Sequence, residues 1–139
     1  LQALANKFLA RMEQLGHPMF ITCTWRDPKE QEALYAQGRT KPGQKVTNAR
    51  AWQSKHCMTR ITPGGKEEPG AWAFDVAFKA PPAKGLYEGP WELVGKVAEE
   101  LGLVWGGSFR TLVDKPHLEL PGPIPAWFVK KYGGNGAAT

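Results

Sequence analysis

Residues 114–120 have the sequence Asp114-Lys115-Pro116-His117-Leu118-Glu119-Leu120, which places a carboxylate three residues before a histidine at the start of a predicted strand. Residues three apart on a regular strand point to opposite faces, so Asp114 and His117 can converge only if the backbone bends between them. Pro116 restricts its own φ angle and favours an extended Lys115, and it therefore supplies that bend. We expect His117 and Glu119 to share the strand face that looks away from the core, with Leu118 and Leu120 on the other.

A second strand is predicted over residues 71–78, where bulky and small side chains alternate. The bulky face, which we expect to lie in the core, consists of Trp72, Phe74, Val76 and Phe78, and the other face of Ala71, Ala73, Asp75 and Ala77. Asp75 is the only charged residue of this strand. The alanines beside it leave room around its carboxylate.

Helical spacing of apolar residues and matching end signals predict several helices. Leu4, Phe8, Met12 and Leu15 trace a first helix that ends at Gly16. Asp27 as N-cap, Pro28 at the first helical position and Gly38 after the last predict a second helix over residues 28–37. A third helix follows Pro90 and ends at Gly102, and residues 125–132 form a last short one.

The remaining segments are predicted to be short strands and loops. Strands are expected over residues 19–26, with Arg26 ending the more polar side, and over residues 103–105. Residues 39–53 are basic and polar and predict a surface loop. Residues 57–70 and 81–89 are rich in Pro and Gly, and we expect loops without any regular element there. The mixture predicts an α+β fold with a small, mainly antiparallel sheet and helices packed against it, as one domain over residues 1–132 with a flexible tail over 133–139.

Composition limits the class of protein. A chain of 139 residues, 42% hydrophobic, can bury a core without disulfides or a structural metal, so any metal is expected to be functional. Cys23 and Cys57 are too few for a disulfide framework, although a single bridge stays open. No stretch approaches the roughly 18 apolar residues of a membrane span, and no secretion signal is visible. The net charge of +5 favours polyanionic partners such as a bacterial wall or nucleic acid, or it is ordinary solubility charge.

The chain has three histidines and three aspartates, and four of these six residues lie at predicted strand edges or loop junctions: His56, Asp75, Asp114 and His117. Two imidazoles and one carboxylate are a common ligand set for catalytic zinc, which leaves one coordination position to water. A second carboxylate could then act as base. Taken singly, His56 could be a hydrogen-bonded surface residue, Asp75 a backbone hydrogen-bond acceptor, Asp114 a turn former and Arg26 a salt-bridge residue.

In combination these residues resemble the zinc peptidases that cleave peptidoglycan stem peptides, a family that includes D-alanyl-D-alanine carboxypeptidases and phage L-alanyl-D-glutamate endolysins. The resemblance spans about residues 20–120. The motifs that carry it are Trp25-Arg26-Asp27, Ser54-Lys55-His56, Ala73-Phe74-Asp75, Trp105-Gly106-Gly107 and Asp114-Lys115-Pro116-His117. It implies a hedgehog/D-alanyl-D-alanine peptidase-like fold.

The same resemblance implies roles for individual residues. His56, Asp75 and His117 would hold Zn²⁺, and Asp114 would be the general base. Arg26 would stabilise the developing oxyanion or orient the substrate, where a fixed cation acts on developing charge. Ser54 would contact the substrate or support a metal ligand.

One departure from the family pattern lies between His56 and Asp75. The pattern leaves six residues between the first histidine and the aspartate, whereas this chain has residues 57–74 there, and the expected glycine is replaced by Ala71 or displaced to Gly70. We interpret residues 57–70 as an inserted loop at the rim of the cleft. A longer loop adds only about 0.6 kcal/mol of closure entropy per doubling, so the metal geometry can survive it.

The favoured function is an endolysin-like peptidoglycan hydrolase of bacteriophage type, acting on the L-alanyl-D-glutamate bond as a monomer. It would be made in the host cytoplasm and act at the cell wall or periplasm, without nucleic acid or stable membrane association. The alternatives are a D-alanyl-D-alanine carboxypeptidase and a non-catalytic basic module that binds wall or nucleic acid. A metal-free hydrolase using Cys57 beside His56 is disfavoured because adjacent strand residues point apart.

Overall fold

The computed structural model describes residues 1–79 and 89–133, which fall into two compact units. Unit 1 contains Leu1–Thr24 and the described part of Ala73–Pro121, and unit 2 contains Trp25–Trp72 and the described part of Gly122–Thr139. Residues 81–88 of the predicted loop and residues 134–139 of the predicted tail lie outside the described residues. The assignment of residues 1–132 to one catalytic domain stays a prediction.

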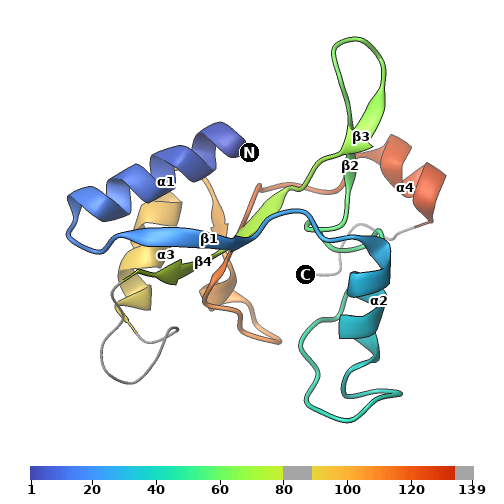
Figure 1. Cartoon of the computed structure of the whole chain (residues 1–139), viewed down its shortest axis with the longest axis horizontal. Coiled ribbons are helices and arrows are strands. Elements are labelled where there is room, and N and C mark those ends of the chain that lie inside the picture. Colours follow the sequence, from blue (N-terminus) through green and yellow to red (C-terminus); the bar gives the residue numbers. More distant parts are fainter. Residues whose placement is uncertain (80–88, 134–139) are drawn as a thin grey trace. The chain divides into compact units, whose positions relative to one another are not determined.

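Unit 1 is built on a four-stranded antiparallel sheet (Figure 1). Its strands are β1 (Met19–Cys23), β4 (Ala73–Phe78), β5 (Val104–Trp105) and β6 (His117–Glu119), in the spatial order β1-β4-β6-β5. Because β4 and β6 are central, each can exchange backbone hydrogen bonds on both sides. The strands that carry Asp75 and His117 are therefore the best-supported part of the sheet.

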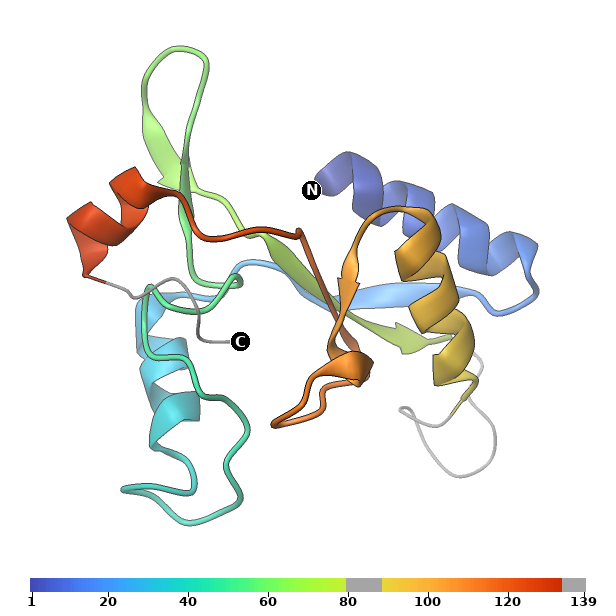
Figure 2. The ribbon, with the colours of Figure 1, turned by 180° about the vertical axis from the view of Figure 1, so that it is seen from behind.

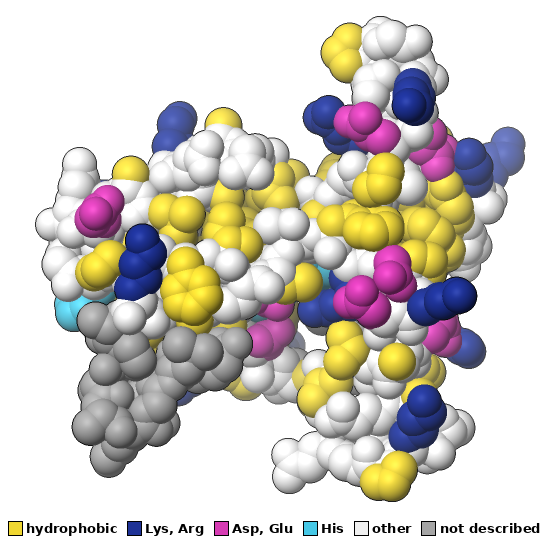
Figure 3. Space-filling model, in the orientation of Figure 1, with side chains coloured by type: hydrophobic (Ala, Val, Ile, Leu, Met, Phe, Trp, Pro, Cys, Tyr) yellow, Lys and Arg dark blue, Asp and Glu magenta, His cyan; other side chains and the backbone are white. Residues whose placement is uncertain are grey.

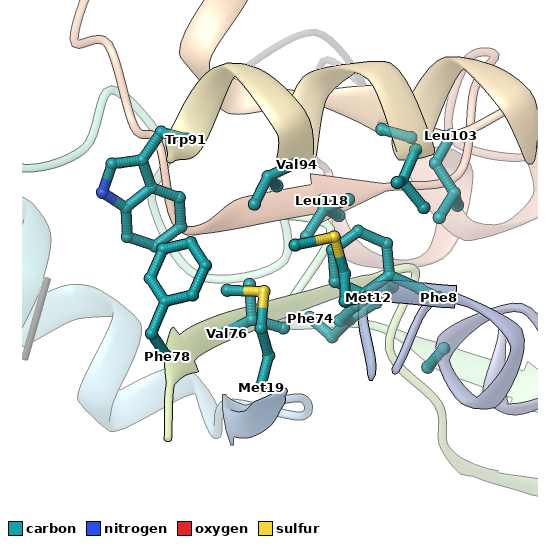
Figure 4. Close-up of a cluster of buried hydrophobic side chains, with 13 residues drawn as sticks. Phe8, Met12, Met19, Phe74, Val76, Phe78, Trp91, Val94, Leu103 and Leu118 are labelled. Carbon is teal, nitrogen blue, oxygen red and sulfur yellow. The ribbon is translucent and has the colours of Figure 1, made fainter. Parts of the chain in front are cut away.

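Helices α1 (Gln2–Gln14) and α3 (Trp91–Glu100) cover one face of this sheet. Figure 4 shows their apolar side chains meeting those of the strands, with Phe8 and Met12 of α1 and Val94 of α3 near Phe74 and Leu118. The rings of Phe8 and Phe74 meet edge to face, with centroids 5.8 Å apart. The predicted α+β class with a small antiparallel sheet is confirmed, as is the amphipathic pattern of both helices.

Two predictions for the strands of unit 1 were wrong in detail. The first strand ends at Cys23 after an irregularity in the β1–β4 register, so Arg26 does not end a strand but lies in unit 2, just before the next helix. Trp72 also precedes its strand and packs in the apolar cluster of unit 2. In both places alternation continues in the sequence beyond the last paired residue, because periodicity reports side-chain pattern and not backbone pairing.

Unit 2 combines helix α2 (Pro28–Ala36), a hairpin of β2 (Thr59–Ile61) and β3 (Glu67–Pro69), and helix α4 (Ala126–Tyr132), and Figure 2 shows it from behind. Helix α2 begins as predicted, because the side chain of Asp27 accepts a hydrogen bond from the backbone N–H of Glu30 at 2.8 Å. A small apolar cluster joins the 52–72 segment to α4. Its members are Met58, Ile124 and Phe128, with Trp52, Trp72, Val129 and Tyr132 packed against them.

The prediction that residues 57–70 contain no regular element was wrong, since β2 and β3 pair there. Pro63, Gly64 and Gly65 all fall in the turn between the two strands, which leaves residues 59–61 and 67–69 free to pair. The backbone N–H of Thr62 donates to the carbonyl of Lys66 at 2.8 Å and closes the turn. The insertion is therefore a defined hairpin.

The surface carries charges of both signs. In the face drawn in Figure 3 the Lys and Arg side chains are scattered among acidic ones, and no dense basic patch forms. Among the described residues, no helix is both long and apolar enough to cross a bilayer.

Candidate active site

The polar face of the unit 1 sheet holds the first group of candidate residues. Asp75 of β4 lies directly opposite His117 of β6 in the antiparallel register, so their side chains share one face. Glu119 shares that face with His117, while Leu118 packs in the core on the other, as predicted. His117 faces away from the hydrophobic core, yet it is only 4% exposed.

The turn from Asp114 to His117 is held by the segment that begins at Trp105. The indole Nε1 of Trp105 donates to the carbonyl of Lys115 at 2.7 Å, and the backbone N–H of Asp114 donates to the carbonyl of Gly106 at 2.9 Å. Within the turn, the N–H of His117 donates to the carbonyl of Asp114 at 3.1 Å. The Trp-Gly-Gly segment therefore places the backbone from which Asp114 and His117 project.

Gly106 is needed for this close approach. A Cβ atom built at residue 106 would lie 2.2 Å from the carbonyl oxygen of Asp114 and 2.9 Å from the Cβ of His117. Neither separation is compatible with van der Waals contact. Only glycine fits at this position while the turn keeps its place.

Asp75, Asp114 and His117 form a cluster of potential metal ligands. One ligand atom from each lies within 4.8 Å of the others. The Nδ1 atom of His117 is 3.2 Å from an Asp75 oxygen and 4.0 Å from an Asp114 oxygen. The Asp75 side chain is 18% exposed and that of Asp114 46% exposed. The three side chains could hold an ion together, and Asp114 is the one most open to solvent.

Unit 2 brings together Arg26, Ser54 and His56. The backbone N–H of Arg26 donates to the carbonyl of His56 at 2.9 Å, and the hydroxyl oxygen of Ser54 accepts the backbone N–H of His56 at 3.2 Å. Ser54 and His56 are buried. The serine of the Ser-x-His motif thus fixes the backbone of the histidine in a local turn.

Gln31 anchors the arginine. Its side-chain oxygen accepts from Nη1 of Arg26 at 3.0 Å, and its Nε2 donates to the carbonyl of Ala49 at 2.7 Å. Gln31 is fully buried, and no role was predicted for it from the sequence. Its burial could have been inferred from helical spacing. Gln31 precedes Leu34 by three residues and Tyr35 by four, so it lies on the helix face that carries the larger apolar side chains.

Cys57 does not have the surroundings of a nucleophile. It is free and fully buried, and burial raises the pKa of its thiol. A reactive cysteine needs a lowered pKa and access to substrate. The structure therefore argues against a cysteine hydrolase built on Cys57.

A buried histidine flanked by carboxylates on the polar face of a small antiparallel sheet is the donor set of a metal-dependent hydrolase. The comparison with protein families agrees. Residues 47–120, more than half of the chain, match the family model described as D-alanyl-D-alanine carboxypeptidase. The chain belongs to this family of peptidases, and the predicted metallopeptidase class is confirmed.

Two individual proteins are similar to the chain. The peptidoglycan L-alanyl-D-glutamate endopeptidase CwlK of Bacillus subtilis is 34% identical over 119 residues, which cover 84% of this chain and 68% of that protein. The crystal structure of the L-Ala D-Glu endopeptidase ChiX of Serratia marcescens gives a TM-score of 0.47 at 19% identity, covering 95% of this chain and 83% of that one.

Proposed function

We propose that this protein is a zinc-dependent peptidoglycan hydrolase that cleaves the stem peptide between L-alanine and D-glutamate. The observation that carries the proposal is the Asp75, Asp114 and His117 cluster, inside the segment that matches the peptidase family. The 34% identity to an endopeptidase named for that bond supports the choice of bond.

The donor atoms suit zinc. His117 supplies an imidazole nitrogen and Asp75 a carboxylate oxygen, and His56 is assigned as the third ligand by its place in the Ser-x-His motif. Nitrogen donors favour zinc over magnesium or calcium, which prefer all-oxygen sites. When bound, zinc would polarise the scissile carbonyl and lower the pKa of water toward 7.

The remaining residues handle protons and charge. Asp114, half-exposed beside His117, would take a proton from the attacking water and pass it to the leaving amine. Arg26, held by Gln31, would stabilise negative charge that develops on the carbonyl oxygen. Ser54 would act by fixing the backbone of His56 and would also be available to contact the substrate.

A paired set of variants tests the catalytic role of Asp114. Asp114→Ala should abolish digestion of purified peptidoglycan while zinc still binds, because the proposed ligand set does not include this residue. Glu99→Ala, an exposed acid at the end of α3, is the matched control and should keep wild-type activity. Retained digestion by Asp114→Ala would contradict the mechanism.

The scissile bond is decided by mass analysis of the fragments. New N-terminal D-glutamate on digested stem peptides is the expected product. Release of terminal D-alanine alone would instead assign D-alanyl-D-alanine carboxypeptidase activity, which is the description of the matched family. Chelation should stop either reaction and added zinc should restore it.

We further propose an endolysin-type role as a monomer, made in the host cytoplasm and acting on the wall. The net charge of +5 supports attraction to a polyanionic wall. Bacteria that make the protein internally should lyse only after their membrane is permeabilised. Lysis without permeabilisation would contradict the proposed compartment, and light scattering would test the monomer.

A further inference from the structure

Glu119 is a buried carboxylate in the middle of the unit 1 sheet. It lies on β6 between Ala73 of β4 and Val104 of β5, and its side chain is only 4% exposed. Burying an ionised carboxylate costs several kcal/mol unless charged or hydrogen-bonding partners compensate. A carboxylate buried at this position therefore needs a hydrogen-bonding or charged partner.

His117 is such a partner. The Oε1 atom of Glu119 is 2.8 Å from Nε2 of His117, at the distance of a strong charge-assisted hydrogen bond. When Glu119 is ionised, its carboxylate can only accept, and in that state the proton of this hydrogen bond lies on Nε2. The opposite ring atom, Nδ1, then points to Asp75 at 3.2 Å and to Asp114 at 4.0 Å.

The two nitrogens of the His117 imidazole therefore have different surroundings. If Nδ1 carries a lone pair, it faces carboxylate oxygens that are also acceptors, and these groups repel one another unless a cation lies between them. Phe109 packs against the ring with centroids 5.6 Å apart and further restricts its rotation. The ring is thus oriented from both its face and its Nε2 edge.

We infer that Glu119 is a positioning residue that holds the His117 proton on Nε2 and so directs Nδ1 to the metal. The inference rests on the proposed metal site and adds a residue to it that touches neither metal nor substrate. Carboxylates that accept from a ligating histidine fix its tautomer and orientation, and their loss typically lowers metal affinity about 10–100-fold.

The test uses zinc affinity, measured on the full chain by competition with a chromophoric chelator. Glu119→Met removes the acceptor but keeps an unbranched side chain, and should weaken zinc binding about 10–100-fold. Glu119→Gln keeps an acceptor oxygen and should recover part of that loss. Leu120→Ala, which trims the core-facing neighbour, should lower thermal stability and leave zinc affinity unchanged.

A spectroscopic measurement tests the proton directly. In long-range proton–nitrogen spectra of the zinc-loaded wild-type chain, His117 should carry its proton on Nε2 and show Nδ1 as the metal-bound nitrogen. A proton on Nδ1 would overturn the inference, and this result decides it even if Glu119→Met does not fold. Wild-type affinity in a folded Glu119→Met chain would also overturn it. Failure of the wild-type chain to bind zinc at all would instead refute the proposed function.

Discussion

Replacing Gly106 by alanine would place a methyl group against the backbone of the Asp114–His117 turn. The new Cβ would lie 2.2 Å from the Asp114 carbonyl oxygen, so the two atoms would have to separate by roughly 1 Å to reach ordinary contact. Overpacking of this kind costs about 1–3 kcal/mol. Weakening the hydrogen bond from the Asp114 N–H to the Gly106 carbonyl adds about 1 kcal/mol.

The expected loss of about 2–4 kcal/mol in the free energy of unfolding corresponds to a fall in Tm of roughly 6–12 °C, at about 3 °C per kcal/mol for a chain of this size. The rate of peptidoglycan digestion should also fall, even where the variant is folded. A displacement near 1 Å of Asp114, the proposed general base, can lower the rate about 100-fold. Thermal unfolding and peptidoglycan digestion, both measured at a temperature where the variant is folded, separate the two effects.

Gly64→Ala is the matched control. A Cβ at residue 64, in the turn between β2 and β3, would meet only the Thr62 hydroxyl oxygen at 3.8 Å, and Gly64 does not have a left-handed φ angle. Its stability should change by less than about 0.5 kcal/mol. If Gly106→Ala behaved like this control in both assays, the Trp-Gly-Gly segment would not position the turn.

Three further predictions concern the rest of the molecule. Gln31→Leu removes the acceptor for the Arg26 guanidinium and the donor to the Ala49 carbonyl. In urea unfolding the free energy of unfolding should fall by about 1–3 kcal/mol, and peptidoglycan digestion should be reduced. Unchanged values in both assays would refute the anchoring role of Gln31. Phe74→Ala should cost about 3–5 kcal/mol because the side chain is fully buried against Phe8, whereas Phe20→Ala, at an exposed position on β1, should cost much less. The pKa of Glu67 lies below its ordinary value because the Lys131 ammonium and the Tyr132 hydroxyl donate to it, so its stabilising contribution is present above about pH 4.5 and disappears as the pH falls through the lowered pKa. Glu67→Gln should therefore lose less stability on acidification than the wild-type chain, and equal losses in urea unfolding would contradict this.

Local signals in the sequence predicted most elements correctly. Helix α2 lies within one residue of its predicted range because Asp27 and Pro28 set its start through the backbone of the first turn. The alternation in β4 placed Phe74, Val76 and Phe78 on the core face and Asp75 on the other, since successive side chains of any strand point to opposite sides.

Interactions between distant segments could not be predicted in this way. The hairpin of β2 and β3 depends on where the prolines and glycines fall within residues 57–70, and composition alone does not report that. The burial of Gln31 depends on the carbonyl of Ala49, which lies 18 residues away. The His56 assignment stays a prediction from its motif.

By itself, the sequence selected the candidate site residues, because histidines and aspartates are few and most of the motifs that contain them lie within the segment that matches a peptidase family. The tertiary structure decided how the side chains of these residues are oriented. The β4–β6 register places Asp75 opposite His117, and the lack of a side chain at Gly106 allows the Asp114 carbonyl to lie close to it. Glu119 lies at hydrogen-bonding distance from Nε2 of the His117 imidazole. These contacts join residues from separate segments at distances of a few ångströms, and only the folded backbone determines such distances.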